Sequence, residues 1–212
     1  MTRFSLPACL LLLLPHAAGA ATVFINEIHY DNSGGDVGEG IEIAAAAGTS
    51  LDGWTLLFYN GSNGSQYGSI GLGGVIDNQQ NGFGTLFFAV DSLQNGGPDG
   101  IALIDSNNLV RQFLSYEGSF VATSGLAAGL SSSDIGVSEA ADTAPGLSLQ
   151  LVGTGTVYQD FSWIMPSMSS YGSVNSGQDF AVVPVPGGLV LLASALGLVS
   201  LRQGLRRAQP VR

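Results

Sequence analysis

The chain has 212 residues and a formal net charge of −10 at pH 7. All of its Asp and Glu residues lie between Glu27 and Asp179, a stretch in which Arg111 is the only cation. A surface of this charge repels phosphate backbones, which are bound by clusters of Lys and Arg, so the composition excludes ordinary nucleic-acid binding.

The N-terminus has the pattern of a secretory signal. Arg3 precedes an apolar run from Leu10 to Leu14, and a small-residue cleavage site follows at Ala18–Ala20. We therefore predict a signal peptide over residues 1–20, recognised by the Sec export machinery. Cys9 is the only cysteine and falls inside this peptide. The exported chain is then expected to hold neither a disulfide framework nor a cysteine-based zinc site.

Residues 21–164 are predicted to form one all-β domain. Short runs of β-branched and aromatic residues are separated by Gly and Asn at intervals typical of a β-sandwich. Strands are expected over residues 22–30, 40–45, 54–59, 67–72, 84–90, 100–105, 109–116, 147–152 and 160–164. In the first strand, strict alternation places Phe24, Asn26 and Ile28 on one face, and Ile25 and Glu27 on the other.

Turn dipeptides punctuate these strands. Asn and Gly accept positive φ at low cost, so Asn-Gly pairs mark tight turns. Four such pairs start at Asn60, Asn63, Asn81 and Asn95. The segment Asp105–Asn108 has the composition of a hairpin tip. Residues 118–146, rich in Ser, Ala and Gly, form the longest irregular stretch, and we predict a loop there with at most one short turn of helix.

The C-terminal part divides into a spacer and a tail. Residues 165–182 are polar and predict a spacer with little potential to form a core. The tail, 183–212, contains an apolar run at 187–201 that would span only about 22 Å as a helix at about 1.5 Å per residue. A bilayer core needs about 30 Å, so we predict a transient membrane helix instead of a permanent anchor. Basic residues would hold its far end in the cytoplasm, namely Arg202, Arg206 and Arg207.

This tail resembles the PEP-CTERM type of bacterial sorting signal. That family combines a proline motif, an apolar helix and an arginine cluster, and its Pro-Glu-Pro appears here as Pro184-Val185-Pro186. The resemblance implies a Gram-negative exporter and cleavage of the tail by an exosortase-like membrane protease. It further implies release of the protein to the cell surface or extracellular matrix.

The predicted β domain resembles the lamin-tail domain of secreted bacterial proteins. The resemblance spans most of residues 22–164 and implies an immunoglobulin-like β-sandwich, in agreement with the strand pattern. The matching segments are FINEIHYDN (Phe24–Asn32), DVGEGIEIA (Asp36–Ala44), LDGWTLLFYNG (Leu51–Gly61), PDGIALID (Pro98–Asp105), SLQLVGTG (Ser148–Gly155) and DFSW (Asp160–Trp163).

An acidic cluster is the strongest candidate for a ligand site. Asp31, Asp36, Glu39 and Glu42 surround a glycine-containing loop, and closely spaced oxygen ligands suit Ca²⁺. The spacing also fits a solvated loop whose Asp and Asn side chains cap their own backbone, and we favour that interpretation. No other cofactor is predicted.

Candidate catalytic residues are few. Glu27 and His29 lie two residues apart on one strand and could act as metal ligands or as an acid–base pair. A histidine buried beside a carboxylate is the commoner arrangement. The run Gly129–Ser133 lacks the second glycine of a nucleophile elbow.

Aromatic residues offer a second kind of binding site. Rings exposed on a strand could stack on sugars of an extracellular polysaccharide, although buried aromatic residues are the default. The candidates are Trp54, Tyr59, Tyr67, Trp163 and Tyr171.

The sequence favours an exported β-sandwich that is not an enzyme. We expect a structural, adhesion or matrix-interaction component at the cell surface or in the extracellular matrix. The alternatives are a calcium- or carbohydrate-binding module, and a metal-assisted hydrolase that uses the acidic loop 31–42, which would need a defined metal set and a placed base.

Overall fold

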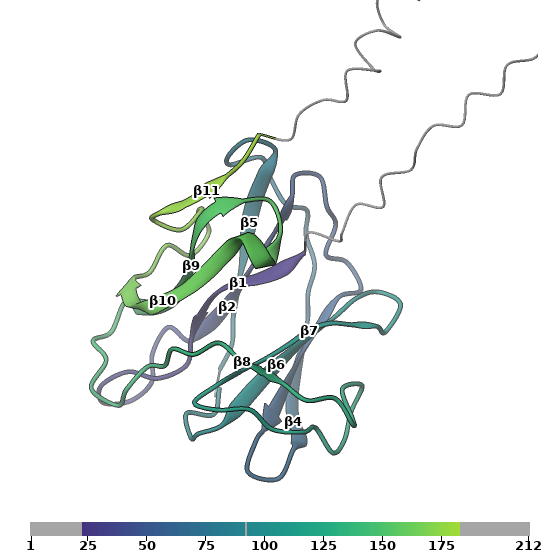
Figure 1. The fold of residues 1–212 in the computed structure, drawn as a ribbon, viewed down its shortest axis with the longest axis vertical. Coiled ribbons are helices and arrows are strands. Elements are labelled where there is room, and N and C mark those ends of the chain that lie inside the picture. Colours follow the sequence, from purple (N-terminus) through teal and green to yellow (C-terminus); the bar gives the residue numbers. More distant parts are fainter. Residues whose placement is uncertain (1–22, 92, 183–212) are drawn as a thin grey trace, which may run out of the picture.

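The computed structural model describes residues 23–91 and 93–182, which form two β-sheets packed face to face (Figure 1). The predicted signal peptide, 1–20, and the predicted tail, 183–212, with Pro184 and its other sorting residues, lie outside these ranges. Within the two ranges, no helix has the length and apolar character needed to cross a membrane. The all-β sandwich predicted from the strand pattern is confirmed.

The first sheet has the strand order β10-β9-β1-β2-β5. These neighbours are antiparallel, and the short strand β11 adds a parallel pairing to the end of β9. Its strands are β1 (Phe24–His29), β2 (Gly40–Ala46), β5 (Phe83–Ala89), β9 (Leu147–Gly155), β10 (Phe161–Met168) and β11 (Gln178–Phe180).

The second sheet has the order β4-β3-β6-β7-β8 and is antiparallel except for the pairing of β7 with β8. A single 3₁₀ turn, η1 (Tyr158–Asp160), connects β9 to β10 in the first sheet. The strands of the second sheet are β3 (Thr55–Asn60), β4 (Ser65–Gly71), β6 (Asp99–Ile104), β7 (Val110–Tyr116) and β8 (Ser133–Asp134).

The main core lies between the two sheets. Alternate side chains of each strand point toward the facing sheet, and burial of this apolar surface is the largest favourable contribution to folding. The fully buried members include Ile28, Ile41 and Ile43 from the first sheet and Leu56, Ile101 and Leu103 from the second.

A β-bulge in β1 changes the predicted alternation of its side chains. Ile25 pairs with Ile43, but Glu27, and not Asn26, pairs with Glu42, so one extra residue lies in β1. An extra residue shifts the two-residue period by one position. Ile25 therefore joins the inter-sheet core together with Ile28. The strict alternation predicted for this strand is wrong beyond the bulge.

Two predicted turns are confirmed by their backbone geometry. Asn81 and Gly82 have φ values of 52° and 87° and connect Gln80 to Phe83, which form an isolated β-bridge. At the β6–β7 hairpin, Asp105 Oδ1 accepts hydrogen bonds from the N–H groups of Asn107 and Leu109, at 2.8 and 2.9 Å. A short side chain that bonds its own loop is the reason Asp and Asn predict such tips.

The prediction of a spacer over residues 165–182 is wrong. Strand β10 continues to Met168, and β11 places Phe180 in a second apolar cluster on the outer face of the first sheet. The Phe180 ring is fully buried and stacks on Phe83 with ring centroids 4.9 Å apart. We call residues 169–180 the strap, because they run along this outer face. These residues cover a polar surface and are therefore polar themselves. A polar segment is also what a solvent-exposed spacer looks like in a sequence.

Replacing Phe180 with alanine should destabilise the whole domain, although the residue lies near the end of the described chain. Truncating a fully buried phenylalanine typically costs about 3–5 kcal/mol. Urea unfolding would measure this change, with Asp179→Ala as the control because that neighbour is exposed. A Phe180→Ala protein as stable as its control would restore the spacer interpretation.

Candidate functional site

The strap covers two carboxyl groups that are fully buried on the outer face of the first sheet. Glu27 lies in β1 and Glu42 in β2, and the two residues are paired across the strands. Glu27 Oε1 accepts hydrogen bonds from Ser148 Oγ at 2.5 Å, Ser169 Oγ at 2.9 Å and the Ser170 N–H at 2.9 Å. A buried carboxyl group needs such donors, and most of these come from the strap.

Glu42 is held beneath the strap in a similar way. Its carboxyl oxygens accept hydrogen bonds from Asn26 Nδ2 at 3.1 Å and from the Gly172 N–H at 2.6 Å. Burial raises the pKa of Glu42 to about 8, and the neighbouring charge of Glu27 adds to the rise. The Glu42 side chain is therefore protonated in the folded protein at neutral pH.

Amide side chains complete this polar layer. Asn175 Nδ2 donates to the carbonyl oxygens of Asn26 and Leu151, at 3.1 and 2.9 Å, and Gln178 Nε2 donates to Asn26 Oδ1 at 2.7 Å. Tyr171 stacks on Phe87 at a centroid distance of 3.9 Å. The strap is thus held by hydrogen bonds along its length and by aromatic contacts at Tyr171 and Phe180.

A second buried cluster fastens the long loop between β8 and β9 to the end of β1. Glu139 Oε1 lies 2.8 Å from His29 Nδ1, while its Oε2 accepts from the N–H groups of Tyr30 and Asp31 at 2.7 and 2.9 Å. The Glu139 N–H donates in return to the Tyr30 hydroxyl at 2.8 Å. Burial opposes the charged imidazole, but the hydrogen bond and charge of Glu139 outweigh it and raise the pKa of His29.

The structure separates the predicted Glu27–His29 pair. Glu27 bonds to the strap, and His29 bonds to Glu139, a residue 110 positions away in the sequence. Sequence reasoning missed Glu139 because nothing in the irregular stretch 118–146 indicates which strand it contacts. The expectation that His29 is buried beside a carboxylate is confirmed, but the carboxylate is that of Glu139 and not that of Glu27.

The four carboxylates considered as a candidate calcium site do not converge. Asp31 and Asp36 both accept from Asn95 Nδ2, at 3.3 and 3.2 Å, while Glu42 lies beneath the strap. Glu39 Oε2 accepts from the Leu93 N–H at 3.3 Å. Among the described residues, no group of three or more His, Cys, Asp and Glu side chains is arranged to hold a metal ion. The hydrolase alternative required that convergence.

The aromatic residues considered as sugar platforms do not form an exposed row. Tyr59 is fully buried, while Trp54, Tyr67 and Trp163 pack against the inter-sheet core. Tyr171 is covered on one face by Phe87. The expectation that aromatic residues are buried is thus confirmed for Tyr59. Each of the other rings packs against neighbouring side chains on at least one face.

Comparison with known proteins adds no assignment. No protein-family model, no curated protein and no solved structure matches this chain. Function must therefore be inferred from the chain's own chemistry. Its most unusual elements are the two buried clusters at Glu27–Glu42 and His29–Glu139, each of which fastens a segment distant in sequence.

The substitution Glu42→Gln should remove a loss of stability that builds up as pH rises from 4.5 to about 8. The folded pKa of Glu42, about 8, lies above its ordinary value of 4.5. The folded state therefore holds a proton that the unfolded chain releases, and this contribution is complete below 4.5 and lost as pH rises through about 8. Urea unfolding between about pH 5 and about pH 9 should show the wild type losing stability relative to Glu42→Gln. Parallel pH profiles for the two proteins would contradict the assignment.

Calcium should leave the melting temperature unchanged. Asp31 and Asp36 share Asn95 as a donor, and Glu42 is committed to Asn26 and Gly172, so the four carboxylates cannot act as one ligand set. Thermal unfolding with millimolar Ca²⁺ and with a chelator would check this, with Asp36→Asn as a variant that removes one candidate ligand. A calcium-dependent rise that disappears in Asp36→Asn would show that this loop binds calcium.

Proposed function

We propose that this protein is an exported, non-catalytic β-sandwich that serves as a structural or adhesive component of the cell surface or extracellular matrix. The two packed sheets support this proposal, as does the resemblance of residues 22–164 to secreted lamin-tail domains with an immunoglobulin-like sandwich. The C-terminal resemblance to a PEP-CTERM sorting signal supplies the proposed destination.

One observation carries the proposal: the side chains best suited to acid–base chemistry are buried and hold distant segments of the chain together. Glu27 and Glu42 are fully buried and bonded to the strap, and His29 and Glu139 are buried and bonded to each other. A catalytic acid or base must reach a substrate proton within hydrogen-bond distance. Groups enclosed in this way instead tie distant segments to the central strand β1, as expected of a protein whose task is to stay folded outside the cell.

The placement of the strap also fits an exported protein with a C-terminal sorting signal. Phe24, at the start of β1, and Phe180, at the end of β11, belong to the same apolar cluster. The strand that follows the proposed signal peptide and the strand that precedes the proposed tail thus meet at one end of the domain. The proposed sorting residues Pro184 and Pro186 follow almost directly after β11.

Export and processing can be tested by expressing the full chain in a Gram-negative host with and without an exosortase-like protease. Intact mass spectrometry of the envelope and medium should show a protein that starts near Ala21 and ends before Arg202, only when the protease is present. Replacing Arg202, Arg206 and Arg207 with alanine should leave the tail uncut. Recovery of the complete chain from the cytoplasm of both hosts would overturn the proposal.

A further inference from the structure

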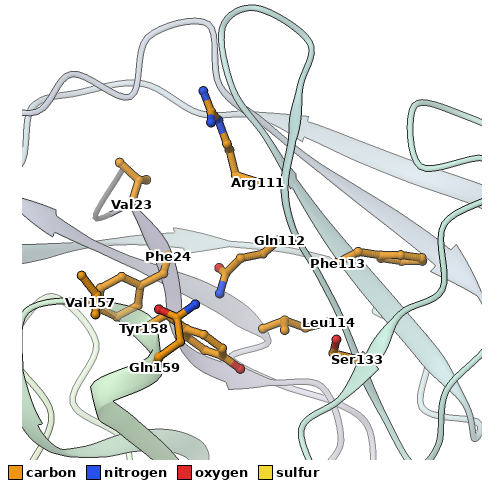
Figure 2. Close-up of a pocket in the computed structure, with 10 residues that line it drawn as sticks. All are labelled: Val23, Phe24, Arg111, Gln112, Phe113, Leu114, Ser133, Val157, Tyr158 and Gln159. Carbon is orange, nitrogen blue, oxygen red and sulfur yellow. The ribbon is translucent and has the colours of Figure 1, made fainter. Parts of the chain in front are cut away.

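A cleft opens between the two sheets at the end where β1 begins. It has a volume of about 420 Å³ and receives side chains from β1, β7, β8 and the η1 region (Figure 2). Phe24 comes from β1, Tyr158 and Gln159 come from η1, and the second sheet contributes Gln112 and Ser133. Aromatic carbon and neutral polar groups therefore meet in one hollow, a combination that is usual in small-molecule sites.

Gln112 presents a fixed donor group at this cleft. Its Oε1 accepts a hydrogen bond from the Ile25 N–H at 2.7 Å, which sets the orientation of the amide. Its Nε2 is buried and has no acceptor among the described residues. A buried donor without an acceptor is costly, so a ligand oxygen that reached Nε2 would supply the hydrogen bond that this group lacks. Figure 2 shows the Gln112 and Gln159 amides facing one another beside the Tyr158 ring.

Tyr158 supplies a flat surface whose orientation is also fixed. Its hydroxyl accepts a hydrogen bond from Trp163 Nε1 at 3.0 Å, and its ring lies against Phe24 at a centroid distance of 6.1 Å. A tyrosine held in this way offers a large contact area with little loss of side-chain entropy on binding. The Gln159 side chain lies on the exposed turn beside it.

The charge of the cleft favours a neutral ligand. Arg111, at its rim, is the only cation between residues 23 and 182, and it is paired with Asp105 at 2.5 Å. In Figure 2 its guanidinium points away from Gln112 and Tyr158. The rest of the domain is strongly acidic and repels anions.

We propose that this cleft binds a neutral sugar residue of an extracellular polysaccharide. The sugar ring would lie against Tyr158, and its hydroxyl oxygens would accept hydrogen bonds from the amides of Gln112 and Gln159. The polysaccharide source rests on the proposed function, whereas the binding chemistry rests on the cleft alone.

The test is titration of the exported, ¹⁵N-labelled protein with glucose, galactose, N-acetylglucosamine and cellotriose at millimolar concentrations. At least one sugar should shift the amide resonances of β7 and η1, and glucuronic acid should bind more weakly. Gln159→Ala should weaken binding several-fold, because it removes an amide donor from an exposed position without removing core packing. Tyr158→Ala should also weaken binding, because it removes the ring against which the sugar lies. Asn107→Ala, on the exposed β6–β7 turn, should leave binding unchanged.

Three outcomes would overturn the inference: no shift with any of the four sugars, shifts that Gln159→Ala and Tyr158→Ala leave unaltered, or tighter binding of glucuronic acid. These outcomes are distinct from a failure of the proposed function. An exported protein that binds none of the sugars removes the site alone. Sugar binding by a protein that is retained in the cytoplasm removes the proposed destination alone.

Discussion

The burial of Glu27 is the constraint on which the outer half of this structure depends. A carboxyl group without solvent must receive hydrogen bonds, and the two sheets by themselves leave this face of β1 uncovered. The donors come from Ser148 within the sheet and from Ser169 and Ser170 in the strap. The fold therefore needs its last described segment to return across the first sheet, and that segment must be polar.

The bulge in β1 connects this polar layer to the core. By adding one residue, it lets Ile25 and Ile28 both face the second sheet, while Asn26 bonds to Glu42 and to Gln178 of the strap. Glu139 then fastens a second distant segment to the next residues of the same strand, through His29 and Tyr30. β1 is thus the element to which both long C-terminal segments are attached, and its central place in the first sheet makes that possible.

This organisation bears on how the protein would endure outside the cell. With Cys9 as its only cysteine, the described domain has no disulfide bond to stabilise it, so its irregular segments are held by buried hydrogen bonds instead. Satisfied polar networks of this kind specify one arrangement of the chain, since an unpaired member would carry a large desolvation cost. Gln112 differs from the residues of these networks in its position, because its unpaired Nε2 lies beside a cleft.

The sequence by itself determined most of the strands and the tight turns between them, but neither β8 nor β11. The runs at 84–90 and 100–105 match β5 and β6 within one residue, and the Asn81-Gly82 turn formed as predicted, because periodicity and turn chemistry are local properties. Only the tertiary structure decided the bulge, the burial of Phe180 and the partners of Glu42 and His29. Each of these depends on contacts between residues distant in sequence, and a polar segment such as the strap looks like solvent-exposed chain until the buried carboxyl groups that it covers are known.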